Sequence, residues 1–382
     1  DSFMKEIEHL GATPYAVFTN SIEDLDIRSK GIRWTLKHYF YHKEKLIPKV
    51  LINLMGYSQS IFADPGDGKE IVEKSIFQDL GIPVIQAMSS YQNRETWEKD
   101  IRGLDPMALI SNVYYPEFDG QLISVTACTC ERIKDESGER EVFLPIVERV
   151  NKIVRLALSW AKLSIIPNRK KKVALILHNM PPRNDMIGSA FGLDTPNSLK
   201  NMTDWFSEIG IFLEYPFESG QEIINKIIQG VSNDRKWLNV EKVMEKSIDT
   251  VSKEKYQRWF LELENEVQKK IEEQWGKAPG EVMVYEDKFP IPGIVNGNVF
   301  IGLQPSRATE ERAEEIYHST DFILPHQYYA FYKWIKEEFR ANVVYHIGTH
   351  GTLEWLPGKE IGLSRSCCPD FNIDYMPHRY PY

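Results

Sequence analysis

Short apolar runs alternate with amphipathic helical segments along most of this chain, and this alternation restricts the fold more than any other feature. One predicted helix, residues 142–163, has apolar residues at a helical period, among them Ile146, Val150 and Ile153. Short apolar strands that are separated by such helices favour a mainly parallel, doubly wound α/β sheet. In the first part of the chain the predicted strands are residues 14–19, 50–55, 82–87, 107–111 and 122–126, and further helices are expected at 69–80 and 94–102.

A second α/β unit is expected to follow a basic linker at residues 167–172. Residues 220–276 differ from their surroundings, because an aromatic and aliphatic stripe runs along an otherwise charged helical pattern. We interpret them as a helical insertion. The sequence thus predicts a flavodoxin-like domain at 1–166 and a second α/β domain at 167–382. The second domain's predicted strands are 173–177, 299–303, 322–324 and 343–346, and its predicted helices are 195–209, 309–317 and 327–340.

Composition restricts the class of function. A chain of 382 residues with 42% apolar and 26% charged residues is typical of a globular protein with two or three domains. The net charge of −9 disfavours nucleic acid or an anionic membrane as a partner. No apolar run is long enough to span a bilayer. The four cysteines form two tight pairs, which favours reduced thiols and a cytoplasmic location, with a metal or redox role for Cys128 and Cys130 as the less favoured alternative.

The stretch at residues 342–359 carries the strongest chemical signal. An apolar run ends in His346, and a glycine-broken turn then presents His350 and Glu354. Ligands bind just past the carboxyl ends of strands in open α/β sheets. Two imidazoles and a carboxylate at that position are suited to ligate a divalent metal or to move protons. The alternative is that both histidines only satisfy local backbone groups.

A second candidate region follows the strand at 173–177. That strand ends at His178, and the next loop contains Arg183, which suits a bidentate grip on a carboxylate, and Asp185, which is suited to orient it. An ordinary salt bridge in a proline-stiffened loop is the alternative. We expect Thr195 to cap the next helix, with Pro196 at its first position, and the open N–H groups there to attract an anion.

Polar residues also gather around the predicted strand 322–324. His318, Asp321 and His326 lie close to it in sequence, and we expect them to approach the sheet edge that carries His346. Roles as helix caps or turn residues are the alternative. The loop 64–69 lacks the spacing of a phosphate-binding loop, and the sequence shows no nucleotide-binding loop elsewhere.

Residues 346–359 read His-Ile-Gly-Thr-His-Gly-Thr-Leu-Glu-Trp-Leu-Pro-Gly-Lys. This run resembles the signature of the large subunit of tetrapyrrole metal chelatases, the family that holds the CobN-type component of cobaltochelatase and the H-type component of magnesium chelatase. The resemblance extends from roughly residue 110 to the end. Further family-like patterns, in family order, are residues 116–120, 192–196, 292–293 with 297–300, 317–319 and 325–334.

The resemblance favours the cobalt branch through residues 192–196 and 376–382, whereas His178-Asn-Met-Pro-Pro182 departs from the commoner Asn-Tyr-Pro pattern. It implies an ATP-dependent chelatase that inserts Co²⁺ into a corrin precursor of cobalamin, with Mg²⁺ insertion into protoporphyrin IX as the alternative. Family members are much longer, so we expect this chain to be an internal fragment, and its activity alone is left open. The resemblance also implies that separate AAA+ motor subunits hydrolyse the ATP.

Metal insertion needs a base for the pyrrole N–H protons, ligands that strip water from the metal, and a grip on the ring. Glu354 is the candidate base or metal ligand, and His346 and His350 are candidate metal ligands. If residues 349–355 form a helical turn, His350 and Glu354 lie on one face of it. Imidazole suits Co²⁺, whereas Mg²⁺ prefers oxygen. Candidate contacts to the ring are Arg183 with Asp185, Lys359, Thr195, His178 and His326. A non-catalytic tetrapyrrole- or metal-binding module and a metal-dependent hydrolase are the rival functions.

Overall fold

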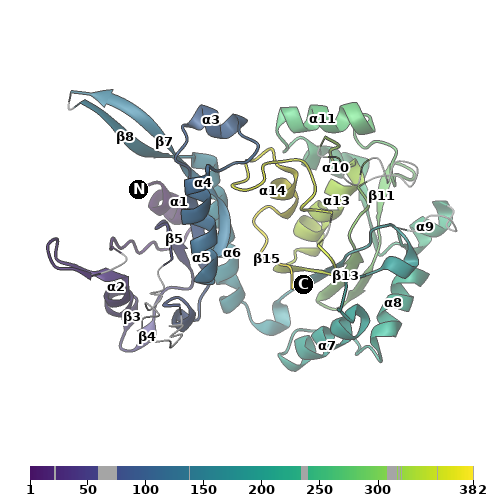
Figure 1. The fold of residues 1–382 in the computed structure, drawn as a ribbon. Coiled ribbons are helices and arrows are strands. Elements are labelled where there is room, and N and C mark those ends of the chain that lie inside the picture. Colours follow the sequence, from purple (N-terminus) through teal and green to yellow (C-terminus); the bar gives the residue numbers. More distant parts are fainter. Residues whose placement is uncertain are drawn as a thin grey trace. The chain divides into compact units, whose positions relative to one another are not determined.

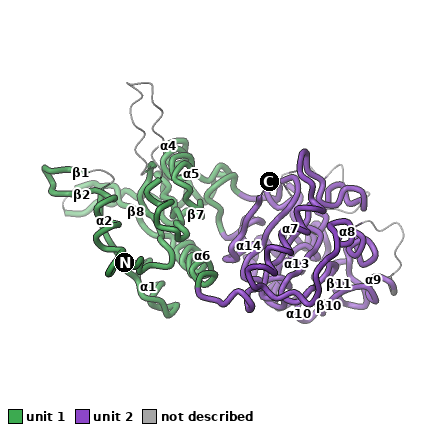
Figure 2. Tube along the Cα trace, turned by 90° about the horizontal axis from the view of Figure 1, so that it is seen from below, with its two compact units in different colours: residues 1–164, 359–364 green, residues 165–358, 365–382 purple. Residues whose placement is uncertain are grey.

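The computed structural model describes residues 1–20, 23–58, 75–136, 138–233, 240–307, 316, 319, 321–350 and 352–381. The chain divides into two compact units (Figure 2). Unit 1 contains Asp1–Ser164 and the short segment Lys359–Ser364, and unit 2 contains Ile165–Gly358 and Arg365–Tyr382. The return of Lys359–Ser364 to unit 1 is absent from the sequence prediction, which placed a single boundary at residue 166.

Unit 1 is built on a four-stranded sheet in the order β5-β6-β7-β8. Strands β5 (Leu51–Asn53), β6 (Val84–Ser89) and β7 (Leu122–Asp135) are parallel, and β8 (Gly138–Pro145) returns antiparallel to β7. Helix α6 (Val147–Ile165) covers one face of the sheet, where Ile153 packs in the cluster that holds Ile85. This burial of one helical stripe on a sheet is the packing that the alternating sequence pattern predicts.

Shorter elements complete unit 1. Helix α3 (Arg94–Lys99) is capped by Asn93, whose side chain accepts from the Thr96 amide. The other elements are α1 (Ser2–His9), α2 (Gly31–Tyr39), α4 (Pro106–Leu109), the π-helical turn η2 (Ile110–Tyr114), α5 (Tyr115–Phe118), the 3-10 turn η1 (Gln78–Leu80), and the hairpins β1 (Glu23–Asp24) with β2 (Ser29–Lys30) and β3 (Tyr41–His42) with β4 (Lys45–Leu46) (Figure 1).

Several predicted elements of unit 1 are wrong. Residues 14–19 are irregular. The predicted strand 107–111 is helical, because the Asp105 side chain caps α4 by accepting from the Met107 and Ala108 amides and Pro106 occupies the first turn. Residues 142–145 belong to β8 and not to the helix that follows. Half of the predicted helix 69–80, and the loop 64–69, lie outside the described residues, and the described half contains the 3-10 turn η1 and not an α-helix.

Unit 2 is built on a five-stranded sheet in the order β12-β13-β9-β14-β15. Its centre is β9 (Val173–Leu177), a fully buried apolar strand that pairs in parallel with β13 (Val299–Leu303) and with β14 (Val343–Ile347). At the edges, β15 (His378–Arg379) is parallel to β14, and β12 (Ile294–Asn296) is antiparallel to β13. Continuous apolar runs fit central strands because both faces of the sheet are covered.

Helices cover both faces of this sheet, as the doubly wound fold requires (Figure 1). Phe206 of α7 (Thr195–Glu208) contacts Tyr345 of β14 on one face. On the other face, α13 (His326–Trp334) packs on Ile176 and Val344, and almost every residue of α13 is buried. The remaining elements are η3 (Asn168–Lys170), η4 (Asn184–Met186), α8 (Gly220–Gln229), α9 (Val240–Lys246), β10 (Asp249–Ser252), α10 (Lys253–Phe260), α11 (Asn265–Trp275), β11 (Lys288–Ile291), the π-helical turn η6 (Ile335–Phe339) and α14 (Cys368–Ile373).

The predicted helical insertion 220–276 also contains a strand. Strand β10 pairs antiparallel with β11, and the aromatic stripe of α10 and α11 forms the core against α13, as its spacing indicates. Residues 322–324 are irregular and do not form the predicted strand. Apart from Ile316, the predicted helix 309–317 lies outside the described residues, as does His318.

Two general features complete the fold. The four cysteines are free thiols. Among the described residues, the helices are all too short or too polar to cross a membrane.

The burial of the central strand gives a direct stability prediction. Leu175 of β9 is 0% exposed, so Leu175→Ala should lower the free energy of unfolding of unit 2 by about 2–5 kcal/mol through lost transfer energy and a residual cavity. Leu261 is 71% exposed in the same unit, and Leu261→Ala should change that free energy by less than about 0.5 kcal/mol. Urea unfolding of both variants measures the difference, and equal losses would contradict the assignment of β9 to the core.

Candidate functional site

Three adjacent parallel strands of unit 2 end at the same level. Leu303 of β13, Leu177 of β9 and Ile347 of β14 are partners in register. The next residues along the chain, Gln304, His178 and Gly348, therefore lie together at the carboxyl edge of the sheet. This edge is the position at which the sequence predicts a ligand site.

His346 lies one residue before the end of β14 and is 1% exposed. Its Nε2 is 2.7 Å from the hydroxyl of Tyr332 on α13, and its Nδ1 is 2.6 Å from Nε2 of His378 on β15. Its ring also stacks on Tyr380, with centroids 5.4 Å apart. Both ring nitrogens are thus engaged by other side chains, and the alternative that His346 binds only local backbone groups does not describe its contacts.

Burial keeps this histidine pair neutral. Desolvation lowers the pKa of His346 well below its usual value, and the neighbouring His378 acts in the same direction. Burial also lowers the pKa of His378 to about 4, with the charge of Arg379 as a smaller cause. A neutral imidazole has one donor and one acceptor nitrogen, so this pair is restricted to a small number of hydrogen-bond arrangements.

Gln304 connects the end of β13 to both tyrosines of α13 and to the loop after β14. Its Nε2 is 3.3 Å from the Tyr328 hydroxyl and 3.2 Å from the Tyr332 hydroxyl, and its Oε1 accepts from the Thr352 amide at 3.0 Å. The Tyr328 hydroxyl in turn lies 3.0 Å from Oγ1 of Thr352. Burial raises the pKa of both Tyr328 and Tyr332, so both phenols stay protonated.

Buried side chains anchor the loop after β14, and its other side chains are exposed to solvent. Thr352, Leu353 and Leu356 are buried, whereas Glu354 and Trp355 are exposed. Short turns form here, with the Trp355 amide bound to the Thr352 carbonyl and the Leu356 amide to the Leu353 carbonyl. From residue 352 on, the described residues therefore form tighter turns and not the α-helical turn that was considered for residues 349–355.

His350 is exposed, and its Nδ1 accepts from the Trp355 indole at 3.3 Å. His346, in contrast, is buried. Among the residues that the structure describes, no three His, Cys, Asp or Glu side chains are placed to hold a metal ion together. Joint metal ligation by His346, His350 and Glu354 thus stays a prediction, and in this conformation a metal would have to displace a hydrogen bond of His346.

His178 lies at the same edge, and the structure brings it close to the His350 loop. It is 5% exposed, its amide donates to the Ile347 carbonyl, and its own carbonyl accepts from Gly188. Burial lowers its pKa, and the charge of His350 acts in the same direction. Gly348 makes this approach possible, because a Cβ at that position would lie 2.7 Å from the His178 Cβ.

The Arg183 and Asp185 side chains bind each other. Arg183 Nε donates to Asp185 Oδ1 at 2.9 Å, and a second bond joins the guanidinium to Oδ2. This bidentate pair lowers the pKa of the Asp185 carboxyl. Both side chains are more than half exposed, so the pair forms the salt bridge that was the alternative prediction, and a ligand carboxylate would have to exchange with Asp185.

Thr195 is not the N-cap. The cap is Asp194, whose carboxylate accepts from the Asn197 amide at 3.1 Å and from the Asn197 side chain at 2.6 Å. Thr195 is 2% exposed, and its hydroxyl donates to the Gly188 carbonyl. The start of α7 therefore already has an anion, the Asp194 carboxylate, beside it, and the binding of a ligand's anionic group there stays a prediction.

His326 is placed in the aromatic core and not at the sheet edge. It is 1% exposed, Nδ1 lies 2.7 Å from the Tyr256 hydroxyl, and Nε2 lies 2.9 Å from the Gly276 carbonyl. In this position His326 is surrounded by core groups, and its contact with the ring stays a prediction.

Lys359 belongs to unit 1, where it closes the end of α3. Its ammonium donates to the backbone carbonyls of Trp97, Glu98 and Asp100 at 2.6, 3.1 and 2.7 Å. The carbonyl end of a helix is the favoured position for a cation. Three backbone carbonyls thus surround this ammonium, and its grip on a ring carboxylate stays a prediction.

The network residues that the sequence prediction missed are Gln304, Tyr332 and His378, together with Tyr328 and Thr352. Gln304 follows a predicted strand directly, so the strand-end rule that found His178 and His346 also applied to it. Tyr328 and Tyr332 are four residues apart, which indicates one helical face. His378 lies in a two-residue strand, which is too short for a periodic signal.

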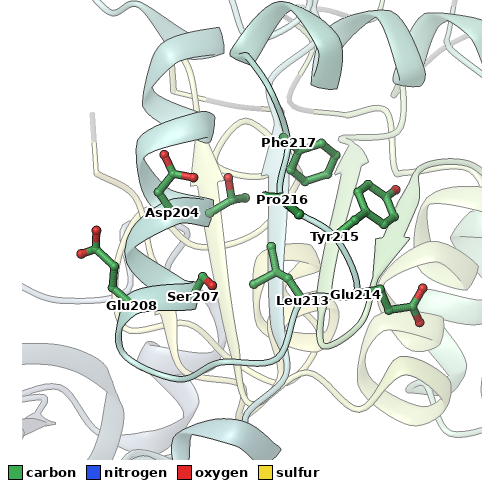
Figure 3. A pocket seen from close by; sticks show the side chains of 9 residues that line it. Asp204, Ser207, Glu208, Leu213, Glu214, Tyr215, Pro216 and Phe217 are labelled. Atoms are coloured by element: carbon green, nitrogen blue, oxygen red, sulfur yellow. The ribbon is translucent and has the colours of Figure 1, made fainter.

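A surface hollow of about 450 Å³ lies at the other end of the sheet. It is formed by the second half of α7 and the loop that follows, with Asp204, Glu208 and Glu214 among its lining side chains (Figure 3). This loop binds the residue just before β13, through the Asn298 amide and the Phe212 carbonyl. The hollow is therefore at the amino edge of the sheet and separate from the histidine network.

The geometry defines an α/β protein with a buried hydrogen-bond network at the carboxyl edge of one sheet and an exposed histidine and glutamate on the loop after β14. Residues 1–382 match the family model described as CobN/Magnesium Chelatase, and the chain belongs to this family. It is 40% identical to an uncharacterized protein of Methanocaldococcus jannaschii over 98% of this chain and 30% of that protein.

Two further relatives and one solved structure have functional names. The chain is 32% identical to the aerobic cobaltochelatase subunit CobN of Pseudomonas aeruginosa, covering 87% of this chain and 26% of the relative. It is 26% identical to the H-type component of the magnesium chelatase of Chlorobaculum parvum, covering 100% of this chain and 28% of the relative. The catalytic subunit of cobaltochelatase from Mycobacterium tuberculosis superposes with a TM-score of 0.79 at 26% identity, over 99% of this chain and 31% of that one. The chain thus spans less than a third of the length of these proteins.

Gly348 gives a prediction about the site. Gly348→Ala places a Cβ against His178 at a φ of +121°, whereas Gly192→Ala meets nothing within 4 Å at a φ of +81°. Both should lose about 1–2 kcal/mol to the left-handed backbone, and Gly348→Ala should lose about 1–3 kcal/mol more to the clash. Unfolding curves of the two variants test this, and equal losses would show that the strand end and the His178 loop are not in contact.

The neutral histidine pair predicts the pH dependence of stability. Because both folded pKa values lie below the unfolded value of about 6.5, the unfolded chain binds more protons below that pH. The contribution of the two neutral histidines to the free energy of unfolding should therefore be fully present above pH 6.5. As the pH decreases toward 4, this free energy should fall by up to about 1.4 kcal/mol per pH unit for each histidine.

Unfolding measured between pH 7 and pH 5 tests this slope, and His378→Gln should reduce it. Stability that rises as the pH decreases would contradict the neutral pair.

Proposed function

We propose that this chain is part of the large, tetrapyrrole-binding subunit of an ATP-dependent metal chelatase. The observation that carries the proposal is the family match over residues 1–382, combined with a carboxyl sheet edge that presents His350 and Glu354 above a buried hydrogen-bond network. Neither half is sufficient alone, because a family match does not locate chemistry and a histidine network does not name a substrate.

Cobalt is the proposed metal substrate. The relatives with functional names include a cobaltochelatase component at 32% identity and a magnesium-chelatase component at 26%, and the structural neighbour belongs to a cobaltochelatase. Imidazole at the exposed loop suits Co²⁺ better than Mg²⁺, which prefers oxygen ligands. The proposed ring substrate is a corrin precursor of cobalamin.

The exposed part of the loop is the proposed point of contact with the reacting centre. We assign the uptake of the pyrrole N–H protons to Glu354, because this residue is exposed on the loop that Leu353 and Leu356 anchor. His350 is the proposed metal-delivery ligand. His346 is a weaker candidate for ligation, because both of its nitrogens are engaged.

ATP hydrolysis is assigned to separate AAA+ motor subunits, as the family resemblance implies. The rest of the full-length protein is proposed to complete the ring cavity, since the relatives are about three times as long as this chain.

Glu354→Gln in the full-length protein should abolish metal insertion and leave ring binding intact, because the amide keeps the size of the side chain but accepts no proton. Fluorescence quenching by a corrin precursor and by a porphyrin measures ring binding, and insertion of Co²⁺ and of Mg²⁺ with the motor subunits measures activity. Glu360→Gln, an exposed glutamate in the part of the chain assigned to unit 1, is the matched control and should keep wild-type insertion.

Insertion that survives Glu354→Gln would remove Glu354 from its proposed role. Ring binding without insertion in the wild type would favour the non-catalytic module, Mg²⁺ insertion would favour the magnesium branch, and the absence of ring binding would contradict the proposal.

A further inference from the structure

Gln304 occupies a position from which one side chain controls two parts of the site. It is 2% exposed, follows β13 directly, and contacts the loop after β14 as well as both tyrosines of α13. One contact of this network fixes the orientation of the Gln304 side chain.

The fixed point is the backbone amide of Thr352. A backbone N–H only donates, so the Gln304 atom that lies 3.0 Å from it must be the carbonyl oxygen. The other end of the same side chain is then the NH₂ group, which has two hydrogens and donates to the hydroxyls of Tyr328 and Tyr332.

Each tyrosine must consequently direct its own hydrogen away from Gln304. The shortest hydrogen-bond contact of the Tyr332 hydroxyl is Nε2 of His346, at 2.7 Å, and we assign the Tyr332 hydrogen to that nitrogen. Tyr328 is assigned as the donor to Oγ1 of Thr352 at 3.0 Å. His346 is neutral and accepts at Nε2, so its hydrogen is on Nδ1, from which it donates to Nε2 of His378 at 2.6 Å. His378 is left with its own hydrogen on Nδ1.

We infer that Gln304 is a positioning residue for the reaction: it orders the loop that carries Glu354 through Thr352, and it sets the tautomers of His346 and His378 through Tyr332. This inference rests on the proposed function for its link to metal insertion. The tautomers rest on the assignment of the Tyr332 hydrogen to His346. Because His378 retains a hydrogen on Nδ1, it acts through that atom as a hydrogen-bond donor, suited to an anionic group and unsuited to a metal.

Gln304→Glu is a sharp test, since it keeps the shape but replaces the NH₂ group by an acceptor. The new carboxylate would receive hydrogen bonds from the Thr352 amide and both tyrosines, which favours its ionised form. Tyr332 would then accept from His346 instead of donating to it. The hydrogen of His346 should move to Nε2, and that of His378 should move to Nε2 as well.

Nitrogen-15 NMR of histidine-labelled full-length protein reports these tautomers. The wild type should show His346 and His378 as Nδ1–H, and Gln304→Glu should show both as Nε2–H. His326 is an internal control in each spectrum, because the Gly276 carbonyl holds its hydrogen on Nε2. Gln274→Glu is the matched control variant: Gln274 bridges the Asp321 carbonyl and the Ile323 amide outside the network, so His346 and His378 should keep the wild-type tautomers.

The functional readout is the metal-insertion rate beside the affinity for the ring. Gln304→Glu should lower kcat at least about 10-fold while the ring Kd changes by less than about twofold, because the substituted side chain does not lie on the exposed loop. His346 found as Nε2–H in the wild type would overturn the inference, as would normal insertion in a Gln304→Glu protein with reversed tautomers. A wild type that shows the expected tautomers but neither ring binding nor insertion would contradict the proposed function and the role of Gln304 in it, and would leave the hydrogen-bond directions established.

Discussion

The hydrogen bond from the Thr352 amide to the Gln304 side chain is the contact on which the candidate site depends. It joins the ends of two strands that β9 separates, and it holds the loop that exposes Glu354. It also orients the Gln304 amide group, whose Nε2 donates to the hydroxyls of the buried Tyr328 and Tyr332. A buried polar network of this kind specifies one arrangement because every unmatched group would be costly in a low-dielectric interior. The site therefore has a buried part, which contains His346, and a solvent-exposed part, which contains His350.

This arrangement separates two roles that the sequence had combined. His346, His350 and Glu354 are neighbours in sequence, and a single metal site was the simplest prediction. The structure places His346 in the layer between the sheet and α13, and places the other two on the surface. The buried His346 is thus suited to a positioning role through its hydrogen bond with Tyr332 of α13. The exposed His350 and Glu354 are suited to contact a substrate.

The sequence predicted the centre of the fold well, for a physical reason. Residues 173–177 and 299–303 are continuous apolar runs, and a run of that length that ends at a polar residue has few alternatives to a buried strand. The same reasoning located His178 and His346 at the sheet edge. It failed at residues 107–111, where the Asp105 cap and Pro106 outweighed the apolar pattern. The doubly wound architecture of unit 2 was therefore predictable, whereas the exact elements of unit 1 were less so.

The binding roles of charged residues were not predictable in the same way. Lys359 and Thr195 bind backbone carbonyls, and sequence patterns carry no information about carbonyls of distant residues. Arg183 binds the carboxylate of Asp185, two residues away, and the sequence pattern did suggest this salt bridge as the alternative. His378 joins the site only through a two-residue strand.

Cryo-electron microscopy of the full-length protein with Co²⁺ and a corrin precursor would test the proposed site most directly. We expect the ring at the carboxyl edge of β9, β13 and β14, with the metal beside Glu354 and His350. A ring bound in the hollow beside Asp204 and Glu214, at the amino edge of the sheet, would contradict this placement.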